Sequence, residues 1–490
     1  MRVIRISLIA CMALILFLGI ISCGHSNEPP ETGPPQITGE GPRPEDAANI
    51  QQNDTQVTDT AHFPDADDPY RFYGQTLTIA SAHTNTLERL ARTYMLLNPG
   101  VTVEVIESDW EQIIILLDAD DAPTLICRWI FNIYDQANAG LIADWLPIMD
   151  AEPSFNEDDY FMNFFYASSV NGRLYAFPIE FLFDFVTANS TVPGLAEAME
   201  WYSARYGGIT ASQLMGLQRS FAALNPLLHD HNFDVTIGAR NNIHDFLDWN
   251  TRQVDFYNQH FIDFINTARE FTSPDREPFG SWRLYMTTPP SREAELSEAY
   301  MFYYITPLML QYLIQFEEDF LFTGTTPIVN SHGELVVRTG NAYVLSAAAN
   351  PVQQALALDF VQFMASRGGR YIMITHDMAG HSVTSHSPLV FPVNRDTLQF
   401  KTEGNFSQIL PMTMMSFYGQ KIVGTRAEAV SRVFEQLTAI GEMPMAPVQP
   451  GNILDIIYIA LIDFHSGWVA AEHVAYELQE RITEALREME

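Results

Sequence analysis

The chain has 490 residues, of which 47% are hydrophobic and 12% aromatic, and its 60 acidic and 26 basic side chains give a formal net charge of −34. This apolar content excludes a disordered chain or a multi-span membrane protein, and the length predicts two lobes or domains. Nucleic acid and anionic lipid headgroups are not expected as partners, because so acidic a surface repels both.

The N-terminus has the layout of a secretory signal, since Arg2 and Arg5 precede an uncharged apolar run at residues 6–21. A retained membrane helix is the alternative, although a full span needs about 20 apolar residues. The run ends in IISC at residues 20–23, which resembles the lipobox of bacterial lipoproteins. The resemblance implies cleavage before Cys23 and a diacylglyceryl group on its thiol, against a chance cysteine after an ordinary signal. Such an anchor would hold the protein at the outer face of the cell membrane.

The composition changes after Cys23. Residues 24–70 are rich in Pro, Gly, Asn, Gln, Asp and Thr and lack apolar periodicity, which predicts a disordered tether. The remaining cysteines, Cys11 and Cys127, form neither a CxxC pair nor a metal-binding spacing with Cys23. Cys127 follows Leu125 and Ile126 and is expected to be a buried apolar side chain.

The folded body begins with the pattern of a strand, a helix and a parallel strand. Residues 77–80 form a short apolar strand, and Asn98-Pro99-Gly100 ends the helix that follows. Valines at every second position of residues 101–105 then predict a half-buried strand. The helix face expected to be buried contains Leu87, Leu90, Ala91 and Tyr94. Such a unit builds a parallel sheet with helices on its faces.

Two later helices are also legible. Asn350-Pro351 predicts a helix start, with Val352, Ala355, Leu356 and Phe363 on the buried face and Gly368-Gly369 at the end. In the last helix one apolar stripe contains Val474, Leu478, Ile482, Ala485 and Leu486. These stripes indicate core packing rather than binding.

Six segments in order resemble the extracellular solute-binding proteins of ABC importers, especially the sugar-binding group that includes maltose-binding protein. The first three are YMLLNPGVTVEVI, AGLIADWLPIMD and NGRLYAFPIEFLFDFVTANST, which ends at Thr191. The other three begin at Gly340, Phe391 and Ile459. The resemblance covers residues 74–490, although the middle, 201–320, matches no motif. Where the family usually has an aspartate after the proline of its first acidic loop, this chain has Thr124, which weakens a ligand assignment there.

The resemblance implies a two-lobed, periplasmic-binding-protein-like α/β fold of type II. Each lobe is expected to be a mixed sheet flanked by helices, and crossing strands are expected to form a hinge between the lobes. The predicted divisions are a signal peptide at 1–22, a tether at 23–70, the first lobe at 71–178 and 342–392, and the second lobe at 179–341 and 393–490.

The implied function is capture of a small solute, with a carbohydrate or oligosaccharide favoured, and its delivery to the transmembrane subunits of an ABC permease by a monomeric protein. Sugars need aromatic faces for stacking and polar groups for their hydroxyls. Position along the predicted lobe edges selects six candidates. Ordinary core packing is the alternative for each tryptophan among them, whereas Glu180 is a carboxylate inside an apolar run and needs a partner. The six candidates are His83, Trp110, Trp129, Tyr175, Glu180 and Trp282.

No catalytic signature accompanies this pattern. The chain has no P-loop, GxGxxG or HExxH motif, and the segment 380–384 has a threonine where a nucleophile elbow has its second glycine. Two histidine groups, His229 with His231 and His376 with His381 and His386, fit surface loops better than a metal site. No enzyme activity, cofactor or metal is therefore expected.

Three alternatives stay open. The same fold could bind a peptide, a polyamine or a metal, the chain could be a secreted glycan-active enzyme, or the binding lobes could serve only sensing or adhesion.

Overall fold

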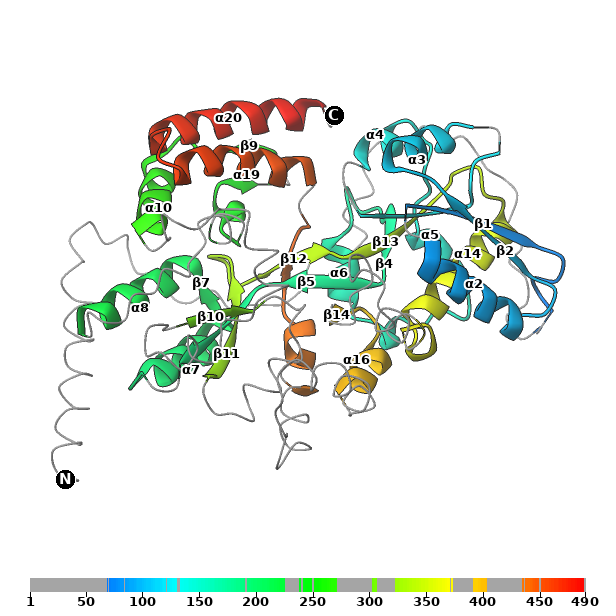
Figure 1. Cartoon of the computed structure of the whole chain (residues 1–490), viewed down its shortest axis with the longest axis horizontal. Helices are drawn as coiled ribbons and strands as arrows, with labels where there is room; N and C mark the ends of the chain where they lie inside the picture. Colours follow the sequence, from blue (N-terminus) through cyan, green and yellow to red (C-terminus); the bar gives the residue numbers. More distant parts are fainter. Residues whose placement is uncertain are drawn as a thin grey trace, which may run out of the picture. The chain divides into compact units, whose positions relative to one another are not determined.

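The computed structural model describes an α/β fold with two mixed sheets and helices packed on them (Figure 1). The residues that it describes are 68, 70–82, 84–119, 121–129, 133–189, 192–224, 238, 241–248, 251–270, 302–305, 322–370, 372, 391–402, 434–435, 437–448 and 451–488. The predicted signal, Cys23 and most of the predicted tether lie outside these residues.

The first sheet has five strands in the order β2-β1-β3-β13-β4. β1 pairs in parallel with β2 and β3, whereas β13 is antiparallel to β3 and β4. Their bounds are β1 Thr76–Ser81, β2 Thr102–Glu107, β3 Leu125–Trp129, β4 Ala176–Pro178 and β13 Asn341–Leu345.

The predicted strand–helix–strand unit is confirmed. The helix α2 spans Thr84–Leu97 and buries the predicted face, and β1 and β2 pair in parallel with Leu77 opposite Val103. Gly100 has a φ of +88°, a left-handed conformation that ends the connection at little cost only because glycine lacks a Cβ.

Helices cover both faces of the first sheet. Side chains alternate along β3, so Leu125 and Cys127 join one hydrophobic cluster while Ile126 joins another. The larger cluster receives α2, α5 (Leu146–Ala151), α6 (Met162–Ala167) and α14 (Pro351–Ala365), and the smaller receives α3 (Trp110–Leu117) and α4 (Tyr134–Asn138).

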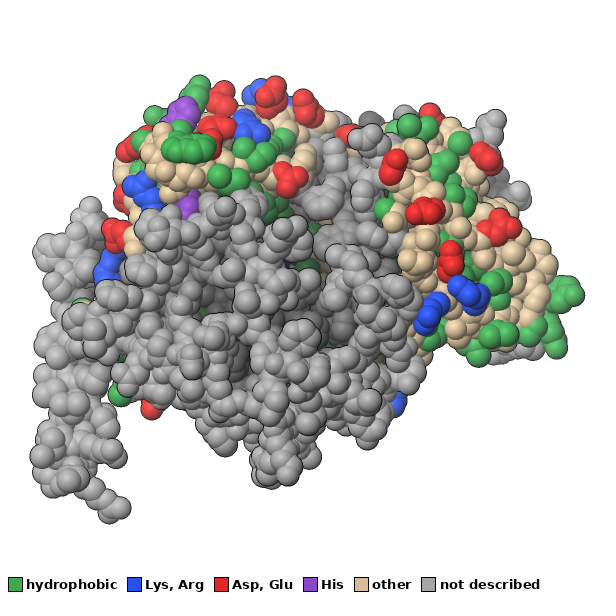
Figure 2. Space-filling view, in the orientation of Figure 1, with side chains coloured by type: hydrophobic (Ala, Val, Ile, Leu, Met, Phe, Trp, Pro, Cys, Tyr) green, Lys and Arg blue, Asp and Glu red, His purple; other side chains and the backbone are tan. Residues whose placement is uncertain are grey.

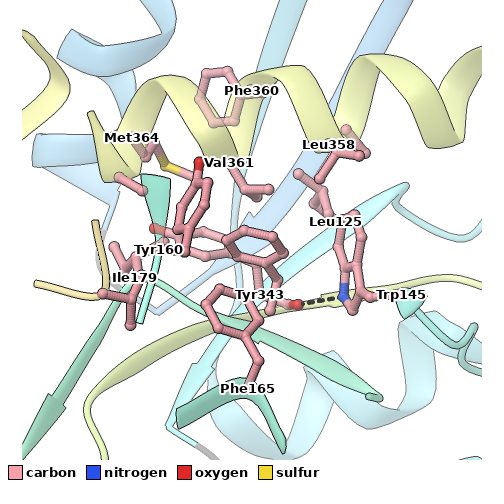
Figure 3. Close-up of a cluster of buried hydrophobic side chains, with 14 of the residues drawn as sticks. Leu125, Trp145, Tyr160, Phe165, Ile179, Tyr343, Leu358, Phe360, Val361 and Met364 are labelled. Atoms are coloured by element: carbon pink, nitrogen blue, oxygen red, sulfur yellow. Dashed lines mark hydrogen bonds between the residues drawn. The ribbon is translucent and has the colours of Figure 1, made fainter. Parts of the chain in front are cut away.

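Large aromatic side chains pack among aliphatic ones in the larger cluster (Figure 3). Trp145 is fully buried, and its indole Nε1–H donates a hydrogen bond of 2.9 Å to the carbonyl of Tyr343 on β13. This bond satisfies the one polar group of a large apolar side chain and fixes its orientation.

The second sheet has the order β10-β6-β11-β12-β5-β14, with β7 beside β11 and β15 beside β12. Neighbouring strands along that order are antiparallel, whereas β7 is parallel to β11 and β15 is parallel to β12. The bounds are β5 Glu180–Phe183, β6 Phe185–Asn189, β7 Ile209–Thr210, β10 Phe302–Ile305, β11 Phe322–Val329, β12 Leu335–Thr339, β14 Phe391–Pro392 and β15 Met445–Ala446.

A separate hydrophobic cluster packs against the second sheet. It contains α7 (Leu195–Tyr206), α8 (Ala211–Leu224), α10 (Gln259–Glu270), α19 (Gly451–His465) and α20 (Ala471–Glu488). The predicted stripe of the last helix is buried in it. The remaining elements are η2 (Glu157–Asp159), η3 (Ile243–Asp245), β8 (Leu247–Asp248), β9 (Gln253–Val254) and α16 (Arg395–Thr402).

The predicted end of one helix is wrong. α14 begins as expected, with Asn350 as its N-cap and Pro351 in its first turn, but it ends at Ala365 rather than at Gly368-Gly369. Ser366 adopts an extended conformation with ψ of 163°, and its hydroxyl donates to the carbonyl of Phe363. A side chain that bonds to the backbone can end a helix before a glycine does.

Acidic side chains are spread over the α19–α20 face rather than collected in one patch, as Figure 2 shows for the described residues. Among those residues, every helix is too short or too polar to cross a bilayer. The predicted α/β class with crossing strands is confirmed.

Candidate functional site

The chain passes directly between the two sheets at two adjacent places. Only Ile179 separates β4 of the first sheet from β5 of the second, and only Gly340 separates β12 from β13. The two passes bond to each other, because the Ile179 N–H donates to the Asn341 carbonyl (3.1 Å) and the Gly340 N–H to the Glu180 carbonyl (3.1 Å). We call these paired passes the strand crossing.

A third segment lies beside the strand crossing. β14 pairs with β5, with Phe391 opposite Phe181, and the Val393 N–H donates to the Ile179 carbonyl over 3.3 Å. Val393 in turn accepts from the Phe161 N–H at 2.9 Å. Three stretches far apart in sequence therefore meet at this point, as the sequence resemblance implied for residues 171–191, 340–366 and 391–396.

A buried ion pair lies at the crossing. Glu180 is 2% exposed, and its carboxylate Oε2 accepts from the Arg370 guanidinium at 2.6 Å. Its Oε1 accepts from the backbone N–H of Asn341 at 3.1 Å and from the Asn341 side chain at 2.5 Å. The partner that a carboxylate in an apolar strand requires is thus supplied from within the protein.

The same arrangement occurs four residues further along the chain. Asp184 follows β5 and is buried, and its Oδ1 accepts from the Arg338 guanidinium at 3.1 Å. Its Oδ2 accepts from the Asn241 side chain at 3.0 Å. Each buried carboxylate therefore has one arginine and one asparagine partner, and Arg338 and Asn341 stand on the strands that flank Gly340.

Gly340 allows the Glu180 side chain to lie against the returning strand. A Cβ at Gly340 would be 2.7 Å from Glu180 Cγ and 2.9 Å from Oε1, closer than van der Waals contact permits. The second pass therefore requires glycine for close approach rather than for a left-handed φ.

The six predicted ligand residues differ in how the structure places them. Glu180 is engaged by Arg370 and Asn341 as above. Tyr175 is half-buried just before β4, and its hydroxyl is 3.5 Å from Arg173 Nη1. Trp110 begins α3 and Trp129 ends β3, and their side chains lie outside the described set, as do His83 and Trp282 entirely.

Thr124, which stands where the resembling family has aspartate, has a structural part in the first sheet. Its N–H donates to Thr78 Oγ1 at 2.9 Å, and its carbonyl accepts from the Ser346 N–H at 3.0 Å. These bonds tie the start of β3 to β1 and to the residue after β13.

The histidine groups predicted from sequence, at 229–231 and 376–386, lie outside the described residues. Within the described ones no cluster of His, Cys, Asp and Glu could hold a metal ion. Two other histidines come together there. His244 in η3 has its pKa lowered to about 4 by burial and then by the nearby charge of His332, in the turn after β11.

Sequence reasoning missed the partners of the crossing carboxylates. Arg370 is 190 residues from Glu180, and Arg338 is 154 residues from Asp184. A lone arginine near an apolar helix end carries no local signal of such pairing. Asp184 had the same signal as Glu180, because it too is a carboxylate in the apolar run of residues 179–186.

No family model and no curated protein matches the chain. Among solved structures it is similar to an ABC substrate-binding protein from Listeria monocytogenes in complex with cycloalternan, at 13% identity over 84% of this chain and 99% of that one, with a TM-score of 0.48. It is also similar to a cyclic alpha-maltosyl-1,6-maltose binding protein from Arthrobacter globiformis (12%, 84% and 99%, TM-score 0.49). A third is the GacH receptor of Streptomyces glaucescens, solved unliganded and with acarbose (14%, 85% and 98%, TM-score 0.48). Identities this low assign no ligand or partner to this chain.

Proposed function

We propose that the protein is a lipid-anchored receptor on the outer face of a bacterial cell, which captures a small carbohydrate between two lobes and passes it to an ABC permease. The observation that carries the proposal is the strand crossing, where two one-residue passes join two sheets. A short paired connection lets two bodies move relative to each other while staying in register.

Binding of this kind requires the ligand to favour one arrangement of the lobes over the other. Closure would bury the sugar between the lobes, with Tyr175, Trp110 and Trp129 as proposed stacking residues. Of these, Trp129 pairs with Asn341 of the crossing. The carbohydrate class is proposed from the sequence resemblance to the sugar-binding group. Glu180 is better suited to hold the crossing together than to contact ligand, because both of its oxygens already accept hydrogen bonds.

A thermal-shift screen against mono- and oligosaccharides tests the binding proposal. A ligand that binds only the folded state at a hundredfold excess over its Kd adds about 2.7 kcal/mol to the free energy of unfolding. We expect one sugar to raise the melting temperature, and Tyr175→Ala to reduce that rise. The matched control Tyr257→Ala removes a tyrosine that is 58% exposed on another part of the chain and should leave the rise unchanged.

Two outcomes would contradict the proposal. If no sugar shifts the melting temperature while a peptide, polyamine or metal does, the ligand class is wrong. If the purified protein turns over a chromogenic glycoside, it is an enzyme.

The lipid anchor has its own test. Intact-mass analysis of membrane-extracted protein should find a diacylglyceryl group on Cys23, and Cys23→Ser should release the protein into the medium.

A further inference from the structure

The outer surface of α7 carries a compact group of aromatic side chains. Trp201 is 52% exposed and Tyr206 is 44% exposed, and Tyr202 lies half-buried between them and the core. Arg205 completes the group, which we call the α7 platform. Scattered apolar side chains are normal on a surface, but a contiguous aromatic group marks an interaction site.

The members of the platform hold one another in place. Ring centroids of Trp201 and Tyr202 are 5.0 Å apart, those of Trp201 and Tyr206 6.0 Å, and those of Tyr202 and Tyr206 6.2 Å. The Arg205 guanidinium carbon lies 5.5 Å from the Trp201 ring and 5.6 Å from the Tyr206 ring. A platform ordered before binding loses little conformational entropy when a ligand arrives.

The other side of α7 already supplies its contribution to the fold. Leu195 and Met199 are fully buried in the core of the second sheet. Within the described chain, every aromatic-ring and cation–ring contact of the platform is with another of its own members. The exposed rings are therefore not explained by packing of the second sheet.

Polar groups flank the rings on both sides. Arg205 Nε donates to the Tyr206 hydroxyl at 3.1 Å, and the other guanidinium N–H groups have no partner among the residues that the structure describes. Glu197 stands one turn before Trp201 and is exposed, so a carboxylate acceptor and a guanidinium donor stand about 12 Å apart along the helix axis. The exposed turn at 331–333 adjoins the platform, because a Cβ at Gly333 would lie 3.5 Å from the Tyr206 carbonyl.

We propose that the α7 platform binds a neutral polysaccharide or oligosaccharide on the surface of the protein. A sugar ring presents apolar C–H faces that stack on aromatic rings and hydroxyls that need both donors and acceptors, and the platform offers these together. An anionic polymer does not fit, because Glu197 and Glu200 outnumber Arg205 locally and the chain carries a net charge of −34.

Affinity electrophoresis of the full-length protein in detergent, in native gels that contain laminarin, soluble starch or xylan, tests the proposal. We expect at least one of these neutral glycans to retard the wild type. Trp201→Ala and Tyr206→Ala should each weaken retardation about tenfold, the change produced by losing about 1.4 kcal/mol of stacking. Trp201→Phe, which keeps a flat ring, should retain part of the binding.

The matched control is Trp468→Ala. Trp468 is 77% exposed in the turn between α19 and α20, so its removal deletes an indole that is even more accessible than Trp201, at a different place on the chain. The control should be retarded like the wild type, and all variants should keep the wild-type melting temperature to within a few degrees. The proposal is overturned if no neutral glycan retards the wild type, if Trp201→Ala is retarded as strongly as the wild type, or if Trp468→Ala loses as much binding. The thermal-shift screen remains a separate test, since a ligand held between the lobes should still stabilise Trp201→Ala.

Discussion

At the scale of single residues, the strand crossing combines polar chemistry with close backbone approach. Glu180 is a charged group in an almost fully buried position, and a buried charge is costly unless it is paired and hydrogen-bonded. The sequence predicts that Glu180 needs a partner, because the strand around it is apolar. It cannot predict Arg370 or Asn341, because nothing local links residues 161 and 190 positions away.

The buried pair makes a direct prediction for stability. Glu180→Gln should lower the free energy of unfolding by about 3 to 5 kcal/mol, since the Arg370 guanidinium stays buried and loses its carboxylate. Urea denaturation followed by circular dichroism measures this loss. The control is Glu270→Gln, which breaks the Arg219 ion pair whose partners are 61% and 64% exposed. It should cost no more than about 1 kcal/mol, and equal losses at the two sites would contradict the role given to burial.

The backbone at the second pass makes another prediction. Gly340→Ala should lower the free energy of unfolding by about 1 to 3 kcal/mol, because the new Cβ would lie 2.7 Å from Glu180 Cγ. Urea denaturation midpoints of the wild type and of Gly340→Ala provide the measurement. Gly216→Ala in α8 is the matched control, since a Cβ added there would meet no atom within 4 Å. That substitution should raise the free energy of unfolding by up to about 1 kcal/mol through helix propensity. If both variants were equally destabilised, the clash with Glu180 could not be the cause at Gly340.

At the scale of elements, the sequence predicts the start of a helix correctly where the residues that fix it are its immediate neighbours. The start of α14 follows from Asn350-Pro351, and the structure adds the reciprocal bonds of a capping box with Gln353. The predicted end of α14 lies too late, because glycine is the usual stop signal whereas here the Ser366 hydroxyl bonds back to Phe363. Exposure of the α7 rings could not be predicted either, since an aromatic at helical spacing is as readily core as surface.

The capping box of α14 gives a prediction at this scale. Asn350→Ala removes the acceptor for the Gln353 N–H, a bond of 3.0 Å, and should lower the free energy of unfolding by about 1 kcal/mol. Gln353→Ala removes only the reciprocal bond to the Asn350 N–H and should cost less. Thermal melts of both variants check the ranking. A Gln353→Ala loss larger than that of Asn350→Ala would show that the cap is not the main interaction.

At the scale of the whole molecule, sheet order depends on contacts between distant parts of the chain. β13 lies between β3 and β4 although more than 150 residues separate it from either strand, and no periodicity within β13 encodes this position. The strand–helix–strand unit was predictable because its parts are sequential. The crossing was predictable only through resemblance, and the proposed sugar site and domain boundaries stay predictions.

Cys127 offers a probe of the whole fold. It lies on β3 in the larger hydrophobic cluster. Burial raises the pKa of its thiol to about 11, although hydrogen bonds with Tyr343 and Ser81 lower it. A neutral thiol shielded from solvent reacts poorly with alkylating reagents. In a chain that begins at Gly24, Cys127 is the sole cysteine, so iodoacetamide labelling at pH 8 should require unfolding. We expect labelling to follow the urea unfolding curve, and fast labelling without urea would contradict the burial of β3.

The same thiol predicts how stability depends on alkaline pH. The unfolded thiol has a pKa near 9.0 and the folded one about 11, so the folded state holds the proton more tightly and its advantage is complete below pH 9. As the pH rises from 9 towards 11 the unfolded state releases its proton first, and about 2 to 3 kcal/mol of stability should be lost. Buried Tyr343 and Tyr94, whose pKa values burial also raises, add to the loss, so the comparison must be with Cys127→Ala. Between pH 9 and 11 that variant should lose less stability than the wild type, and parallel curves would mean that the Cys127 proton is not linked to folding.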